Sequence, residues 1–405
     1  MTDLSRDPVA LTAALVRCES VTPAEAGALT LLAGLLAPAG FDCRRLVMTE
    51  PGFPDVDNLY ARIGSGHPHL CFAGHTDVVP AGDIAAWTHG PFSGDIAEGF
   101  VWGRGTVDMK GNIAAFLVAA LDWLRRPGNA ARGSISFLIT GDEEADAVNG
   151  TIKVLDWMAR NGETPDHCIV GEPSCSEKLG DTLRIGRRGS LGARLVVNGR
   201  QGHVGYAHLA NNPVRGFVKV ASALWEQPID EGTPHFVPSN LEIVSVDVDN
   251  PVYNVVPAHI EAKMNVRYNS LHTGADIRRW LEETAARALE GTGLAHEWTF
   301  SAGNAESFVT EPGPLVDMIA AILEAETGHP PILSTAGGTS DARFVKDYCQ
   351  VVELGLVSKG IHAVDEKVPV EDLKRLTAIY GRVIESYFST FAPERSPPLG
   401  RAAPQ

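Results

Sequence analysis

Three short apolar runs in the first half of the chain each end in a glycine that is followed by acidic or imidazole side chains. LCFAG precedes His75 and Asp77, SISFLITG precedes Glu143 and Glu144, and CIVG precedes Glu172. Apolar runs of this length, bounded by glycine, are typical of buried strands. In an open α/β sheet, ligands bind outside the carboxyl ends of the strands. We therefore expect these side chains to meet at one edge of a sheet.

Helical patterns separate these runs. Residues 1–182 alternate strands with helices, and this alternation predicts an α/β domain with a mostly parallel central sheet. The helices are expected at 9–20, 26–37, 110–126 and 151–162.

The order changes between residues 183 and 300. There the pattern reads β-α-β-β-α-β, which is the ferredoxin-like α+β arrangement. Its elements are expected at 191–199, 212–226, 239–248, 258–269, 274–290 and 296–302. The α/β pattern resumes over 301–390, so we interpret 183–300 as a domain inserted into a catalytic domain. Residues 391–405 are Pro-rich, and we expect them to be disordered.

Composition excludes some classes of function. The chain of 405 residues has 34 basic and 50 acidic residues and a net charge of −16. Such a chain repels phosphate backbones and anionic membranes, so we expect neither nucleic acid nor membrane as a partner. The N-terminus lacks the pattern of a signal peptide. The six cysteines form no CxxC pair and no evident disulfide framework. These features favour a cytoplasmic protein.

The charged side chains after the strands form a donor set suited to metal ions. Asp108 lies at the start of a predicted helix, and His362 follows the apolar run QVVELGLV. Imidazole nitrogen and carboxylate oxygen are ligands that zinc accepts, and one carboxylate can bridge two ions. Asp108, Glu144 and Glu172 would neutralise three of the four charges of a zinc pair. Glu143 is then left as a general base, and Asp77 as the residue that orients His75.

Each of these features also has an ordinary structural explanation. A pair of adjacent glutamates is common on a solvated helix face, as at 282–283. The run GRGTVD has an aspartate where a dinucleotide fingerprint needs its third glycine, and Lys110 does not lie in a phosphate-binding loop. His67 and His69 precede a strand, and we expect both to be exposed.

The motifs GHTDVVP, GRGTVDMKGN, TGDEE, GEPS, GGTSD and IHAVDE follow one another in this order. Together they resemble the dinuclear zinc aminoacylase and exopeptidase family. The resemblance implies two divalent metal ions per subunit, Zn²⁺ with Co²⁺ able to substitute. It assigns His75 and Glu172 to one ion, His362 and Glu144 to the other, and Asp108 to both. It also implies a homodimer through the inserted domain, with His203 reaching the partner's active site.

The runs RRGSLGARL, GRQGHVGYAHLANNP and GGTSDARF are most similar to the desuccinylase branch of that family. This implies hydrolysis of N-succinyl-LL-2,6-diaminopimelate, a substrate with three carboxylates. Arginine forks suit carboxylates. The candidate substrate-binding residues are Arg187, Arg188, Asn254, Arg267, Thr339, Ser340 and Arg343.

Three alternatives stay open. The chain could be a related deacetylase or carboxypeptidase of the same family. It could be a phosphate-ester hydrolase with the same two metals, which the shortage of lysines near the motifs disfavours. It could also be a non-catalytic dimeric binding protein, which predicts a missing ligand or base.

Overall fold

A computed structural model describes the chain except residues 1–2, 227, 302–304 and 393–405. The predicted disorder of the C-terminal tail therefore falls almost entirely outside the described residues. The chain forms two compact units. The first comprises residues 1–183, 311–332 and 344–405, and the second comprises 184–310 and 333–343. The segment 333–343, which the sequence placed within 301–390, thus groups with the second unit.

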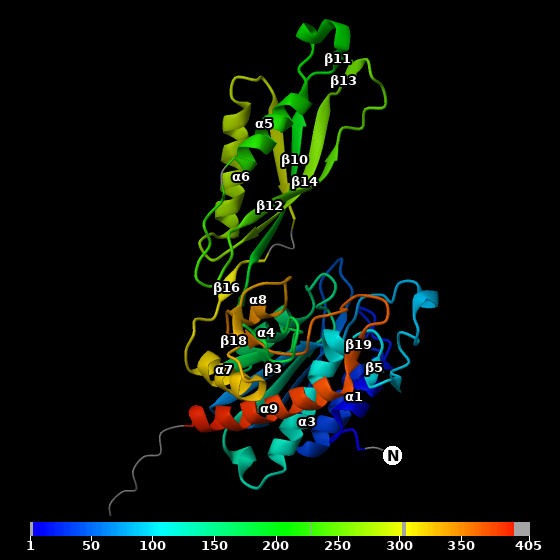
Figure 1. The fold of residues 1–405 in the computed structure, drawn as a ribbon, viewed down its shortest axis with the longest axis vertical. Coiled ribbons are helices and arrows are strands. Elements are labelled where there is room, and N and C mark those ends of the chain that lie inside the picture. Colours follow the sequence, from blue (N-terminus) through cyan, green and yellow to red (C-terminus); the bar gives the residue numbers. More distant parts are fainter. Residues whose placement is uncertain (1–2, 227, 302–304, 393–405) are drawn as a thin grey trace, which may run out of the picture. The chain divides into compact units, whose positions relative to one another are not determined.

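The first unit is built on a mixed sheet whose centre is parallel (Figure 1). The strand order is β1-β2-β6-β3-β7-β18-β8-β17, and the pairs β6–β3, β3–β7 and β7–β18 are parallel. The expected α/β class with a mainly parallel sheet is confirmed. The strands are β1 (Asp42–Met48), β2 (Val56–Gly64), β3 (His69–His75), β6 (Ser134–Thr140), β7 (His167–Val170), β8 (Thr182–Arg184), β17 (Ile332–Ser334) and β18 (Gln350–Glu353). The antiparallel pair β1–β2 was not predicted.

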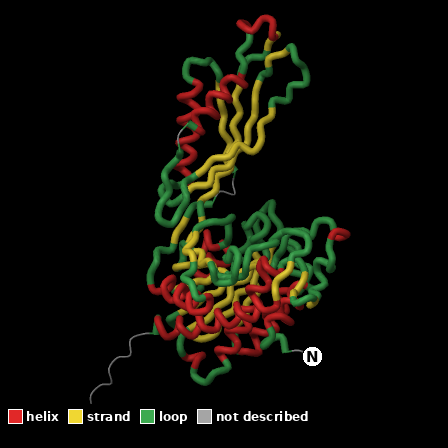
Figure 2. The backbone as a smooth tube through the Cα atoms, viewed as in Figure 1, coloured by secondary structure: helices red, strands yellow, loops and turns green. Residues whose placement is uncertain are grey.

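Helices pack together beside this sheet, as Figure 2 shows. α9 contacts α1, α3 and α7, while α2 and α4 contact strands at the β1–β2–β6 end. Their bounds are α1 (Pro8–Val16), α2 (Ala28–Leu36), α3 (Gly111–Leu124), α4 (Thr151–Arg160), α7 (Pro314–Thr327), α8 (Ala342–Val345) and α9 (Val370–Thr390). Among the described residues, none of the helices combines the length and hydrophobicity needed to cross a bilayer.

A small three-stranded sheet joins two distant parts of the chain in the first unit. It has the order β19-β5-β4, with β4 (Ile96–Ala97), β5 (Phe100–Trp102) and β19 (Lys367–Pro369). β5 and β19 are antiparallel, and Trp102 pairs with Lys367. The pairing places the segment leading to Asp108 beside the segment that follows His362.

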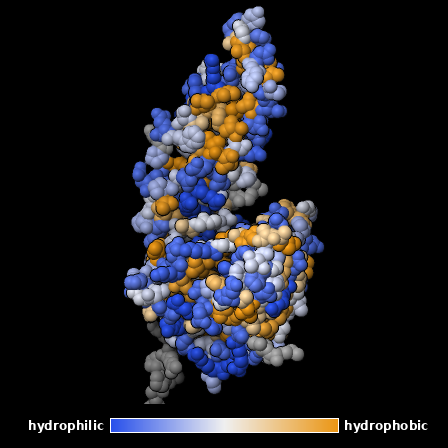
Figure 3. Space-filling model, turned by 45° about the vertical axis from the view of Figure 1, so that its right-hand side comes forward, coloured by the Kyte–Doolittle hydropathy of each residue, from blue (hydrophilic) through white to orange (hydrophobic). Residues whose placement is uncertain are grey.

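The second unit has the predicted order β-α-β-β-α-β. Its elements are β10 (Gly189–Asn198), α5 (Pro213–Trp225), β12 (Asn240–Asp247), β14 (His259–Tyr268), α6 (Gly274–Leu289) and β15 (Ala295–Phe300). The sheet order β12-β14-β10-β15 is antiparallel throughout. Alternate residues of β10 are buried, because one face of the sheet packs on α5 and α6. A hydrophobic patch is visible on this unit in Figure 3, and exposed valines of the edge strand β12 include Val244 and Val246.

One local prediction was wrong. His69 is the first residue of β3 and is buried, whereas it was expected to be exposed. Its Nε2 lies 2.8 Å from Ser136 Oγ on the neighbouring strand. Burial lowers the pKa of His69 to about 4, with a smaller contribution from the charge of Arg62. The strand begins earlier than the apolar run suggested, because this imidazole finds a hydroxyl partner in the core.

Candidate metal centre

The carboxyl ends of three parallel strands deliver most of the candidate ligands. β3 ends at His75, and the sheet ladder continues beyond the strands. The amide of Thr76 donates to the carbonyl of Thr140 at 3.0 Å, and that of Gly171 donates to Ala73 at 3.0 Å. Because these bonds fix the first residues after each strand, the loops that carry Glu143, Glu144 and Glu172 leave the sheet at one edge.

Asp108 lies between two imidazoles. Its Oδ1 is 3.2 Å from Nε2 of His75, and its Oδ2 is 3.5 Å from Nε2 of His362. The two histidines are 287 positions apart in the chain, as 362 minus 75 gives. Each oxygen of one carboxylate thus faces a different imidazole. This is the arrangement in which a carboxylate can bridge two cations.

Glutamates complete both sides of this centre. Oε1 of Glu172 lies 3.8 Å from Nε2 of His75, and Oε1 of Glu144 lies 2.9 Å from Nε2 of His362. Two groups have ligand atoms close enough for a cation, namely His75 with Asp108 and Glu144, and His75 with Glu143 and Glu172. All five predicted ligands are therefore brought together, and Glu143 lies among them.

The electrostatics of this cluster favour added positive charge. Burial alone lowers the pKa of His75, but its hydrogen bond to Asp108 and nearby carboxylate charges raise that pKa well above its usual value. Hydrogen bonds to Asp108 and Glu144 raise the pKa of His362 to about 10. Burial works to raise the pKa of Asp108, yet the two imidazoles hold it well below its usual range. The carboxylates of the cluster thus favour positive charge beside them.

Asp77 is buried behind His75 and acts on it through the backbone. Nδ1 of His75 donates to the carbonyl oxygen of Asp77 at 2.9 Å, which leaves Nε2 to face Asp108. The carboxylate of Asp77 instead accepts the amides of Glu143 at 3.3 Å and Glu144 at 3.0 Å. Burial raises the pKa of Asp77 to about 6. One residue therefore orients a ligand and holds the loop of the predicted base.

The predicted substrate-binding residues all lie in the second unit. Arg187 is buried and donates to the carbonyl of Gly338 at 2.9 Å, and Arg188 donates to Oδ1 of Asn240 at 3.0 Å. Burial, and then the charge of Arg188, lowers the pKa of Arg267. The others of this set are Asn254, Thr339, Ser340 and Arg343.

His203 and Asn254 are neighbours within the second unit. β11 (Gly202–His203) pairs with β13 (Val255–Val256), and His203 is opposite Val255. Both His203 and Asn254 are exposed. The amide of Val204 donates to the carbonyl of Asn254 at 3.0 Å. His203, to which the resemblance gives a cross-subunit role, thus lies beside the substrate-binding candidate Asn254.

Sequence reasoning missed two residues next to the metal centre. Arg104 and Glu366 form a buried ion pair of 2.8 Å, and Glu366 also accepts backbone amides beside Asp108. Both residues stand inside motifs that were singled out, GRGTVDMKGN and IHAVDE. The only signal in the sequence was that Arg104 stands between two glycines of the first motif.

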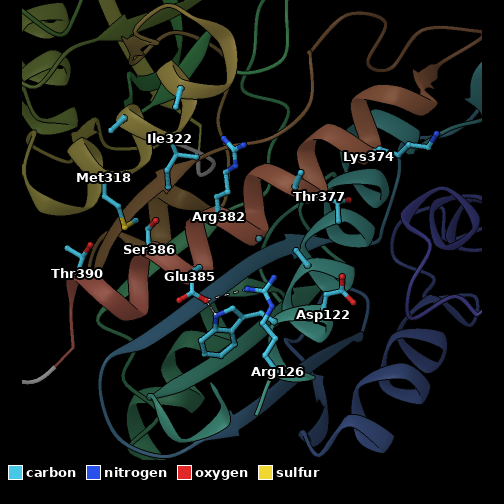
Figure 4. A pocket seen from close by; sticks show the side chains of 16 residues that line it. Asp122, Arg126, Met318, Ile322, Lys374, Thr377, Arg382, Glu385, Ser386 and Thr390 are labelled. Atoms are coloured by element: carbon cyan, nitrogen blue, oxygen red, sulfur yellow. Dashed lines mark hydrogen bonds and ion pairs between the residues drawn. The ribbon is translucent and has the colours of Figure 1, made fainter. Parts of the chain in front are cut away.

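A separate cavity of about 880 Å³ lies between α3, α7 and α9 (Figure 4). None of the candidate site residues lines it. Glu385, which lines it, accepts hydrogen bonds from Trp123 at 2.8 Å and Arg132 at 2.8 Å. Arg382 pairs with Glu326 at 3.3 Å. Two charged groups of the lining are therefore already paired with other side chains, and we do not assign the chemistry to this cavity.

Comparison with protein families identifies the family of this chain. The model of peptidase family M20/M25/M40 matches residues 71–386. The chain belongs to this family. The family predicted from the motifs is thereby confirmed, and the match spans both the candidate metal ligands and the inserted elements.

Relatives of high identity share one name. A succinyl-diaminopimelate desuccinylase of Methylorubrum extorquens (strain PA1) is 55% identical over 385 residues, which are 94% of this chain and 99% of that protein. One of Rhodopseudomonas palustris (strain BisB5) is 54% identical over 387 residues, 95% of this chain and 99% of that protein.

Solved structures of the family share the fold at low identity. Aminopeptidase PepT from Bacillus cereus ATCC 10987 superposes with a TM-score of 0.76 at 20% identity, covering 95% of this chain and 99% of that one. The Bacillus subtilis YXEP protein, described as a dinuclear metal binding peptidase, gives 0.69 at 14% identity, covering 95% and 98%.

The residues of this chain fit a pair of divalent cations. The donors are imidazole nitrogens and carboxylate oxygens, without a thiolate. Asp108 has one oxygen on each side, and each side has one imidazole and one glutamate. The chain thus carries a possible dinuclear metal site.

Proposed function

We propose that this chain hydrolyses N-succinyl-LL-2,6-diaminopimelate to succinate and LL-2,6-diaminopimelate. The observation that carries the chemistry is the position of Asp108 between His75 and His362. The succinylated substrate is supported by relatives that are 54–55% identical over nearly their full length and carry the desuccinylase name.

We propose Zn²⁺ as the natural ion at both positions, with Co²⁺ able to substitute. His75 and Glu172 would hold one ion, His362 and Glu144 the other, and Asp108 both. When bound, such ions lower the pKa of water and polarise a carbonyl oxygen. The mixed nitrogen and oxygen donors support zinc over magnesium or calcium, which prefer all-oxygen sites.

Glu143 is the proposed proton carrier. Its backbone is held by the Asp77 carboxylate, and its side chain lies within the ligand cluster. Glu143 takes a proton from water as the water oxygen bonds to the amide carbon. It then gives the proton to the amide nitrogen as the C–N bond breaks, so one water is consumed for each succinate and amine released.

Arginines of the second unit are proposed to bind the substrate carboxylates. Arg188 and Arg267 are close enough for the charge of one to lower the pKa of the other. Two cationic side chains held together in this way favour an anion between them, and a carboxylate matches the fork of a guanidinium. Thr339 and Ser340, in the loop before α8, and Arg343, within α8, add hydrogen-bond donors.

We propose a homodimer formed through the second unit and working in the cytoplasm. The edge strand β12 exposes hydrophobic side chains, and proteins commonly cover such edges. The exposed His203 and Asn254 would then contribute to the partner's site. The cytoplasmic assignment is supported by six cysteines outside any disulfide.

A substrate panel tests this function. The purified protein, loaded with zinc, is assayed on succinyl-diaminopimelate, an N-acetyl amino acid, a dipeptide and a phosphate ester. We expect kcat/KM to be highest on the succinyl substrate, to fall on chelation and to return with zinc. A higher kcat/KM on the acetyl substrate or the dipeptide would reassign the chain within its family. Phosphate release would favour an esterase, and no turnover with zinc bound would favour a binding protein.

A further inference from the structure

Arg104 and Glu366 form an ion pair that the proposed chemistry does not use. Nη1 of Arg104 lies 2.8 Å from Oε2 of Glu366, and both side chains are at most 2% exposed. The antiparallel pairing of β5 with β19 brings them together, and the amide of Gly103 donates to the carbonyl of Glu366 at 2.9 Å. The pairing of β5 with β19 therefore fixes the positions of the two residues relative to each other.

Glu366 holds the backbone of the shared carboxylate. Its Oε1 accepts the amide of Val107 at 2.9 Å and that of Asp108 at the longer distance of 3.4 Å. The opposite oxygen is occupied by Arg104. The carboxylate thus links the turn that presents Asp108 to the guanidinium, and a charged acceptor makes such amide bonds stronger than a neutral one does.

Arg104 binds the backbone of the loop that carries His362. Its Nη1 donates to the carbonyl of Ala363 at 3.0 Å, and its Nη2 donates to the carbonyl of His362 at 3.2 Å. The backbone of His362 has a φ of +59°, in the left-handed region that residues other than glycine adopt at a cost. The side chain of His362 is 46% exposed, so packing alone does not fix this loop.

The other half of the centre is positioned differently. His75 is the last residue of β3, and Glu172 follows β7 by two residues. β3 and β7 are hydrogen-bonded to each other, and the carbonyl of Asp77 orients His75. The two sides of Asp108 therefore depend on different supports, central strands on one side and the buried ion pair on the other.

We propose that Arg104 and Glu366 are positioning residues for one cation subsite, the one formed by Asp108, Glu144 and His362. A buried ion pair contributes less to stability than its contacts suggest, because both charges lose their hydration. Its role here is to fix the distance between the turn that carries Asp108 and the loop that carries His362. This inference rests on the proposed dinuclear function.

Metal titration in single-subsite backgrounds tests the proposal. His75→Ala leaves the His362 subsite, and His362→Ala leaves the His75 subsite. Zinc is titrated into each metal-free protein against a chromophoric chelator, with and without Arg104→Lys, which keeps the charge but loses the fork. We expect Arg104→Lys to weaken zinc about 10- to 100-fold in the His75→Ala background, and by no more than about twofold in the His362→Ala background.

Two further variants separate positioning from stability. Glu366→Gln should give the same selective pattern, and Arg104→Lys supplies the result if Glu366→Gln does not fold. Glu163→Gln removes the half-buried Arg62–Glu163 pair, 2.5 Å long and built from none of the metal ligands, and should lower the Tm while leaving zinc affinity unchanged.

The outcomes distinguish this inference from the function it rests on. If Arg104→Lys weakens zinc equally in both backgrounds or in neither, or if Glu163→Gln weakens zinc as much as Arg104→Lys does, the positioning role is overturned. If the unmodified protein binds fewer than two zinc ions, the dinuclear function itself fails. If the unmodified protein binds two zinc ions but Arg104→Lys changes zinc affinity equally in both backgrounds, only the inference is overturned.

Discussion

His75 is bonded to the backbone of Asp77, and the carboxylate of Asp77 is turned to other partners. Nδ1 of His75 lies 2.9 Å from the Asp77 carbonyl and 3.6 Å from its Oδ1. The carboxylate accepts hydrogen bonds from the backbone amides of Glu143 and Glu144. The orientation of the imidazole therefore survives a change of the Asp77 side chain, whereas the loop of the predicted base does not.

Asp77→Asn should reduce kcat more than metal content. The new amide has one oxygen for two backbone donors and sets its NH₂ group against one of them, so the Glu143 loop shifts. We expect kcat to fall about 10- to 100-fold with two zinc ions still bound at saturation. Asp166→Asn is the matched control, since Asp166 accepts the amide of His69 at 2.7 Å at the other end of β3. It should lower the Tm and leave kcat unchanged; a loss of zinc from Asp77→Asn would contradict the assignment.

Glu143→Gln should abolish most turnover without removing metal. General acid–base catalysis contributes about 10²- to 10⁴-fold, and we expect a loss of that size in kcat. Glu143 also has an oxygen near His75 and Glu172, so a ligand role is the competing explanation. Metal analysis separates the two, because a ligand role predicts that one zinc is lost. Glu144→Gln serves as the comparison and should lose the ion held with His362.

Val244→Lys should dissociate the proposed dimer. Val244 is 67% exposed on the edge strand β12, and a lysine there opposes edge-to-edge association. Analytical ultracentrifugation should show a monomer that has lost turnover, because His203 of a partner is then missing. Val47, 60% exposed on the edge strand β1 of the first unit, supplies the control. Val47→Lys should sediment and turn over like the parent; an unchanged sedimentation of Val244→Lys would exclude this edge as the interface.

His69 should make the stability depend on pH on the acidic side. Its pKa is about 4 in the folded protein and near 6.5 in an unfolded chain. Between these values the unfolded state binds more protons, so the free energy of unfolding falls as the pH drops from 6.5 to 4. A shift of this size corresponds to roughly 3 kcal/mol.

His69→Gln should flatten this part of the curve, measured by urea unfolding of the metal-free protein between pH 4.5 and about 7. The exposed His329, replaced by glutamine in the same way, is the comparison. An identical slope in the His69 variant and the parent would show that this imidazole does not carry the dependence.

The pattern of the sequence predicted the α/β class and the β-α-β-β-α-β unit because both depend on local periodicity. It also placed His75, Glu144 and Glu172 at one sheet edge, since a strand followed by glycine and a polar residue predicts where the side chain emerges. Those inferences need only the direction of each strand. The antiparallel pair β1–β2 was missed, because charged residues such as Arg44 and Arg45 interrupt its apolar pattern.

Supporting contacts could not be predicted because they join segments far apart in the chain. Nothing local shows that Glu366 accepts the amide of Asp108, 258 positions away. The exposure of His69 was mistaken for the same reason, since its partner Ser136 lies on another strand. The detailed part played by Asp77 likewise depends on whether carbonyl or carboxylate faces the ring, which only coordinates reveal.

Anomalous diffraction from a crystal of the zinc-loaded protein tests the dinuclear centre most directly. The account predicts two zinc peaks about 3.5–4 Å apart, with one oxygen of Asp108 bound to each, His75 on one ion and His362 on the other. A single peak at full zinc occupancy, or two peaks without Asp108 between them, would contradict it.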